Sequence, residues 1–183
     1  MLALFGILYI TGLLTTIMGG LQSLILATGL ISPNISAELT DKNFDYQGRF
    51  TAIDGNVIDL QEYRGKTLFI NLWATWCPPC RAEMPHIDKL FQNTKETENL
   101  EFLMIALDED FEKSKKYIED KNFTFPVVHA TYGLNHSLQS QSIPTTLVVG
   151  PNGKILFYQE GMSNFNTAEF RDFLVKSSEK SGE

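Results

Sequence analysis

The chain has only two cysteines, Cys77 and Cys80, separated by two prolines within 183 residues. Before them, Lys66 to Trp73 forms a near-continuous apolar run, which predicts a strand buried on both faces. After them, apolar residues recur at helical spacing, so Cys77 is expected at a helix N-terminus and Cys80 one turn inside. The helix dipole and free N–H groups there favour a Cys77 thiolate. Because this spacing also lets the sulfurs close a disulfide, the pair predicts thiol-disulfide exchange with Cys77 as nucleophile.

The residues beside the cysteines modify this chemistry. Pro78 and Pro79 have no N–H, so one donor that would stabilise the Cys77 thiolate is missing. We therefore expect a moderately acidic thiol, which suits a reductant better than a strong oxidant. Trp76 is expected to be an exposed contact for a docked polypeptide, with simple packing as the alternative, whereas Trp73 is expected in the core.

Composition excludes several classes of protein. The net charge is −7, and no Lys/Arg cluster could neutralise a row of phosphates, so a nucleic-acid partner is not expected. Aromatic residues make up 11% of the chain, which indicates a folded core rather than disorder. Two cysteines are too few for a disulfide-stapled scaffold or a four-thiolate zinc site, and His86, His129 and His136 show no zinc-finger spacing. No metal site is predicted.

The N-terminal segment differs from the rest because Met1 to Ala37 contain no charged residue and no histidine. Leu2 to Ile31 would measure about 45 Å as a helix, against roughly 30 Å for a bilayer core. We predict a transmembrane anchor within residues 1–31, with a cleaved signal sequence as the alternative. Its orientation is not determined by charge, because the first basic residue is Lys42. Residues 32–43 are expected to form a polar linker and residues 44–178 one domain.

The remaining periodicities predict an α/β domain with a mixed central sheet and helices on both faces. Turn-forming residues separate the short extended segments, and amphipathic segments lie between the strands. The expected elements are a hairpin over Phe50–Leu60, a helix behind Cys77, a strand over Leu100–Leu107, a helix over Asp110–Asp120, a strand over Phe125–Ala130, a helical turn over Leu134–Gln139, a hairpin joining Thr145–Val149 to Lys154–Gln159, and a last helix capped by Asn166 or Thr167.

Two motifs together resemble the thioredoxin superfamily. NLWATWCPPCRAEMP, from Asn71 to Pro85, and SIPTT, from Ser142 to Thr146, are most similar to the membrane-tethered TlpA/ResA-like thiol-disulfide oxidoreductases. The resemblance covers roughly Phe44 to Lys176. It implies a thioredoxin-like fold with an N-terminal β-hairpin and an additional βα unit at about Leu100 to Lys121.

The resemblance also implies roles for individual residues. Pro144 corresponds to a cis-proline that faces the active-site disulfide, and Ile143 before it matches reductant members. Glu83 corresponds to an active-site glutamate that moves the proton of Cys80, although a solvent-exposed helix-face glutamate is the alternative. Asn71 replaces the buried aspartate of cytoplasmic thioredoxins. The predicted catalytic residues are Cys77, Cys80 and Glu83, and the predicted substrate contacts are Trp76, Pro78, Pro79, Ile143 and Pro144.

The function expected from the motifs and the resemblance is reduction of disulfides in extracytoplasmic proteins by a membrane-anchored, monomeric domain. The Cys77–Cys80 pair is the redox group, so no dissociable cofactor is expected. The family implies substrates such as apocytochrome c and a membrane electron donor.

Two alternatives stay open. A copper-binding module could use both thiols with His129 or His136, although the copper-delivery domains of this fold carry CxxxC. A thiol peroxidase would need the PxxxTxxC signature, but this chain has Ile70 and Ala74 at the proline and threonine positions.

Overall fold

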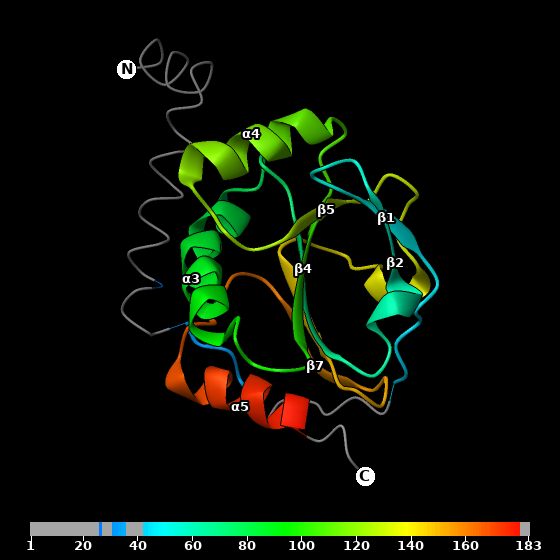
Figure 1. Cartoon of the computed structure of the whole chain (residues 1–183). Helices are drawn as coiled ribbons and strands as arrows, with labels where there is room; N and C mark the ends of the chain where they lie inside the picture. The colour runs from blue at the N-terminus through cyan, green and yellow to red at the C-terminus, as the bar shows by residue number, and fades with distance from the viewer. Residues whose placement is uncertain (1–25, 27–30, 36–41, 180–183) are drawn as a thin grey trace.

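The computed structural model describes residues 26, 31–35 and 42–179 (Figure 1). Within this part of the chain, no helix is both long enough and apolar enough to cross a membrane. The anchor predicted within residues 1–31 lies outside the described residues, apart from Leu26 and Ile31, and stays a prediction.

One mixed sheet of seven strands runs through the domain in the order β2-β1-β5-β4-β3-β6-β7. The central strands β3, β4 and β5 are parallel, and β1, β2, β6 and β7 pair antiparallel at the two sides. The strands are β1 (Arg49–Ala52), β2 (Val57–Asp59), β3 (Thr67–Trp73), β4 (Leu100–Ala106), β5 (Val127–His129), β6 (Thr145–Val149) and β7 (Ile155–Glu160). Both predicted hairpins and the three predicted central strands are therefore confirmed.

One face of this sheet is covered by the α-helices. These are α3 (Pro78–Thr94), α4 (Phe111–Lys121) and α5 (Ala168–Glu179). Every residue of β3 is buried, and its side chains Phe69 and Trp73 join the core cluster that packs against the three helices. This burial on both faces explains why the strand reads as a continuous apolar run.

The opposite face carries two short 3-10 helices, so both faces carry helices as expected, but the α-helices lie on one face. The 3-10 helices are η1 (Leu60–Tyr63) and η2 (His136–Leu138). Leu60 and Leu138 pack with Leu68, Ile70 and Leu72 of β3 in a second core cluster. The helical turn predicted over Leu134–Gln139 is confirmed, because η2 lies within that segment.

Candidate active site

Cys77 caps the N-terminus of α3, as its position before the helical pattern predicts. Its Sγ accepts a hydrogen bond of 3.2 Å from the Cys80 backbone N–H. Pro78 and Pro79 occupy the first two helical positions and offer no N–H. Cys80 therefore supplies the helix-start donor that stabilises negative charge on the Cys77 sulfur.

The two cysteines form a disulfide and differ in exposure. The sulfurs lie 2.07 Å apart. Cys77 retains 4% of its surface, whereas Cys80 is completely buried. An incoming thiol or disulfide can therefore reach the pair only at Cys77, which agrees with the nucleophile predicted from sequence.

The residue pair Ile143–Pro144 lies against this disulfide. The peptide bond between them is cis, as the resemblance implied. The carbonyl oxygen of Ile143 lies 3.7 Å from Cys77 Sγ. Residues 66 positions apart in the chain are thus brought together, because β6 pairs with β3 in the sheet.

A groove of about 510 Å³ opens beside the same residues. Trp76 forms part of its wall and is 66% exposed, so it is not packed in the core, whereas Trp73 is fully buried as expected. The lining side chains are apolar or neutral and carry no formal charge. They are Trp76, Leu107, Leu134, Gln139, Ser140, Gln141, Ser142 and Ile143.

Glu83 is fully buried, which excludes the solvent-exposed alternative. One carboxylate oxygen accepts a hydrogen bond of 2.8 Å from Asn71 Nδ2, and the other accepts one of 3.1 Å from the Ser163 backbone N–H. Burial raises the pKa of Glu83 to about 8, although both hydrogen bonds act to lower it. The residue stands one helical turn beyond Cys80, so a titratable carboxyl group is buried close to the second cysteine.

The loop before Pro144 is held by Glu160, a residue that the sequence patterns did not single out. Its carboxylate accepts hydrogen bonds from the Ser142 hydroxyl at 3.0 Å and from the Gln141 backbone N–H at 3.3 Å. Tyr158 donates a third bond of 2.8 Å. These contacts lower the pKa of Glu160 and order the polar wall of the groove. Its place at the end of a strand gave no signal, because two of its partners, Gln141 and Ser142, lie in a loop 18 or more positions earlier.

The histidines of the copper alternative do not gather at the cysteines. Both ring nitrogens of His129 are occupied, one by the Asp108 carbonyl oxygen and the other by Thr131 Oγ1. Among the described residues no group of three or more His, Cys, Asp or Glu side chains could hold a metal ion.

The comparisons with known proteins agree with this geometry. A sequence profile of the AhpC/TSA family matches residues 39–158. The chain belongs to this family. It is also 31% identical over 125 residues to the thiol-disulfide oxidoreductase ResA of Halalkalibacterium halodurans, covering 67% of this chain and 70% of that protein. For ResA of Oceanobacillus iheyensis the identity is 36% over 104 residues, covering 56% of this chain and 54% of the relative.

Two solved structures share the fold of this chain. StoA from Bacillus subtilis superposes with a TM-score of 0.57 at 22% identity, covering 68% of this chain and 93% of StoA. A protein described as a putative disulfide isomerase from Bacteroides thetaiotaomicron gives 0.64 at 22% identity, covering 83% and 90%. The fold is thioredoxin-like, and with the ResA relatives and the Cys77–Cys80 disulfide the protein is a thiol-disulfide oxidoreductase.

Proposed function

We propose that this oxidoreductase works as a reductant of protein disulfides, with Cys77 as the attacking thiolate and Cys80 as the resolving thiol. The observation that carries the proposal is the unequal placement of the two sulfurs. Cys77 stands at a helix N-terminus and retains solvent contact, whereas Cys80 is completely buried. A substrate sulfur can therefore bond to Cys77 and remain within reach of Cys80.

The reaction begins with the reduced pair. The Cys77 thiolate attacks a substrate disulfide, so that a Cys77–substrate mixed disulfide forms and the first substrate sulfur leaves as a thiolate that takes up a proton. Cys80 then loses its proton and attacks the Cys77 sulfur. The second substrate thiol is released, and the enzyme is left with the Cys77–Cys80 disulfide. The substrate gains two electrons from the cysteine pair and two protons, one lost by Cys80 and one taken from solvent, to which Cys77 released its proton when it formed the thiolate.

Glu83 is proposed to accept the proton that Cys80 must lose. A carboxyl group with an ordinary pKa is a weak base toward a thiol whose pKa is about 8.5. Burial raises the pKa of Glu83 to about 8, which brings it close to that of the thiol. Matching the two values makes transfer of the proton possible in either direction, as a reversible exchange requires.

The groove beside Cys77 is proposed to bind the polypeptide around the substrate cystine. Trp76 and Ile143 supply apolar surface at its walls, and the residues from Gln139 to Ser142 supply neutral hydrogen-bonding groups. The predicted contacts Pro78, Pro79 and Pro144 adjoin the same disulfide. A groove without formal charge suits segments whose flanking residues are apolar or neutral, because burying a charged side chain there would cost hydration without a partner.

We further propose that the domain acts outside the cytoplasm as a monomer on an anchor within residues 1–31, with residues 32–43 as linker and 44–178 as the folded unit. The uncharged apolar stretch from Leu2 to Ile31 and the resemblance to membrane-tethered relatives support this location. Apocytochrome c is the proposed substrate class, and a membrane thiol donor would reset the disulfide.

Trapping of the mixed disulfide tests the proposed roles of Cys77 and Cys80. In a Cys80→Ala variant the mixed disulfide cannot be resolved, so adducts through Cys77 should accumulate and disappear on treatment with dithiothreitol. Cys77→Ala is the matched control and should give none. Adducts of equal amount in both variants would contradict the proposed roles. Mass spectrometry of the trapped partners should find extracytoplasmic proteins that contain cysteine, with apocytochrome c among them. Adducts formed with cytoplasmic proteins instead would contradict the proposed location of the domain outside the cytoplasm.

A further inference from the structure

A second buried carboxylate lies close to the cysteine pair and is not part of the chemistry described above. Asp108 stands two residues beyond β4 and is 2% exposed. Its carboxylate accepts three short hydrogen bonds, from Thr75 Oγ1 at 2.6 Å, from the Thr75 backbone N–H at 3.0 Å and from Ser114 Oγ at 2.7 Å. No ion pair to Asp108 occurs within the described ranges. Neutral donors thus satisfy the carboxylate.

The two hydrogen bonds from Thr75 hold the segment that leads from β3 to Cys77. Residues 74–76 connect β3 to Cys77, and Thr75 is the middle residue of the three. The Cys77 backbone N–H donates to the Ala74 carbonyl at 3.2 Å, which closes a turn around Thr75. Because both donors of Thr75 point to Asp108, the position of this turn depends on that carboxylate. The same turn carries the exposed Trp76.

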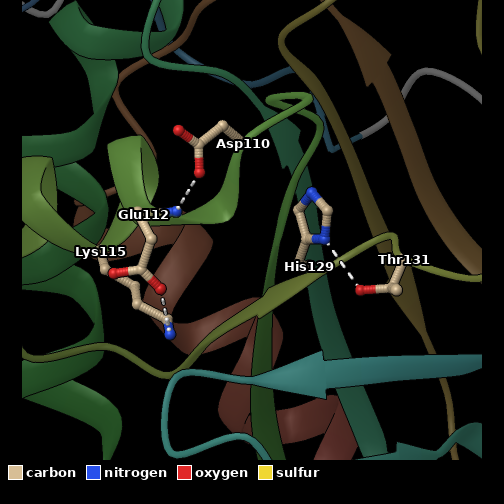
Figure 2. Close-up of polar contacts among 5 residues, drawn as sticks. All are labelled: Asp110, Glu112, Lys115, His129 and Thr131. Atoms are coloured by element: carbon tan, nitrogen blue, oxygen red, sulfur yellow. Dashed lines mark hydrogen bonds and ion pairs between the residues drawn. The ribbon is translucent and has the colours of Figure 1, made fainter.

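Asp108 is itself held from two further elements. Ser114 belongs to α4, and His129 of β5 donates from Nε2 to the Asp108 carbonyl oxygen at 2.6 Å. Since a carbonyl only accepts, Nε2 carries the proton, and in the neutral ring Nδ1 accepts from Thr131 Oγ1 at 2.9 Å (Figure 2). The ring also stacks on Phe111 of α4 with centroids 4.8 Å apart. Hydrogen bonds through Asp108 therefore connect β5 and α4 to the turn that precedes Cys77.

We propose that Asp108 is a positioning residue for the thiol-disulfide exchange. It does not touch the sulfurs, and it acts through Thr75 by fixing where Cys77 and Trp76 leave the sheet. The inference rests on the proposed role of Cys77 as nucleophile. Sulfur attack requires aligned reacting atoms, and a displacement of about 1 Å can cost up to a hundredfold in rate. Loosening the turn should therefore slow exchange even where the domain stays folded.

The chain contains a matched control in Asp88. This aspartate of α3 is 8% exposed and accepts from the Thr124 backbone N–H at 2.7 Å, from Thr124 Oγ1 at 3.0 Å and from Gln92 Nε2 at 2.7 Å. The chemistry is the same as at Asp108, with a threonine that donates both its groups. The difference is that Asp88 fastens α3 to the segment before β5 and does not hold the active-site turn.

The test compares Asp108→Asn with Asp88→Asn in the full chain. An asparagine keeps one acceptor oxygen and turns an NH₂ group toward hydrogen-bond donors, so both variants should unfold at a lower urea concentration. The rate of glutathione-disulfide reduction is then measured against pH, below the unfolding transition of each variant. The pH-independent rate at high pH should fall roughly tenfold for Asp108→Asn. For Asp88→Asn it should stay at the wild-type value.

Thr75 gives a second pair of variants that remains informative if Asp108→Asn does not fold. Thr75→Ser keeps both donors and should retain the wild-type rate, whereas Thr75→Val loses the hydroxyl and should show a reduced one. Equal high-pH rates for wild type, Asp108→Asn and Thr75→Val would overturn the inference. If the wild type itself does not reduce glutathione disulfide through Cys77, the proposed function fails instead, so the two failures are distinguishable.

Discussion

Glu83 is the residue whose protonation connects stability to chemistry. Its pKa in the folded protein is raised to about 8 by burial, against 4.5 for an exposed glutamate. Between these two values the folded state keeps a proton that the unfolded state has lost. The contribution of this proton to stability is fully present below about pH 4.5 and is lost as the pH rises through about 8. Below pH 8, folding therefore favours the protonated acid.

A Glu83→Gln variant should remove this pH dependence. We expect its free energy of unfolding to rise relative to wild type as the pH increases from about 4.5 to about 8, by at most about 5 kcal/mol. Urea unfolding across this pH range measures the difference. The control is Glu101→Gln, because Glu101 forms a half-exposed ion pair with Lys66. Parallel stability curves for wild type and Glu83→Gln would show that the carboxyl is not buried in the native state.

At the scale of elements, each helix beginning is satisfied by a side chain that the sequence supplies locally. Asp110 accepts from the Glu112 backbone N–H at the start of α4 (Figure 2), and Cys77 does so for Cys80 at the start of α3. For α5 the sequence left Asn166 and Thr167 as alternatives. The structure selects Thr167, because its hydroxyl oxygen accepts from the Phe170 backbone N–H at 3.2 Å.

Removing this cap should destabilise α5 and the domain. Thr167→Ala is expected to lower the free energy of unfolding by about 1 kcal/mol, since the Phe170 N–H loses its acceptor. Thermal or urea unfolding checks the value. Thr167→Ser retains the hydroxyl and should remain within about 0.5 kcal/mol of wild type. A loss of the same size in both variants would mean that the threonine methyl group matters and the cap does not.

At the scale of the whole molecule, the sheet separates two core clusters, and β3 contributes side chains to both. Aromatic rings dominate the helix side, where Phe170 of α5 contacts Phe69, Phe157 and Phe165 at centroid distances from 5.2 to 6.2 Å. On the other side aliphatic side chains from β3 meet η1 and η2. Because β3 belongs to both clusters, loss of either side is expected to unfold the domain in one transition.

Phe170→Ala should test this cooperativity. Phe170 is completely buried, so its truncation is expected to cost about 3–5 kcal/mol of unfolding free energy. The measurement is urea unfolding followed by tryptophan fluorescence and by far-ultraviolet circular dichroism, whose transitions should coincide. Val57→Ala is the control, because Val57 is 51% exposed and should change stability by less than about 0.5 kcal/mol. Two separate transitions would show that the clusters fold independently.

The local features of the protein were determined by the sequence alone. Apolar runs located the strands, turn residues located the hairpins, and the position of Cys77 between a strand and a helical pattern predicted its place as a cap. The exposure of Trp76 and the cis bond before Pro144 followed from the neighbouring motif and the resemblance. The predictions made from apolar runs, turn residues and the position of Cys77 succeed because they depend on residues a few positions apart.

Only the tertiary structure decided which polar side chains lie inside. The sequence left a solvent-exposed position open for Glu83 and gave no signal for Asp88, yet both side chains are buried in α3. The hydrogen-bond donors of the buried carboxylates are distant in the chain. Ser163 is 80 positions from Glu83, and Thr75 is 33 positions from Asp108. A carboxylate can be buried only where donors replace water. Those donors come from other strands and loops, so the spacing of residues along one helix could not predict them.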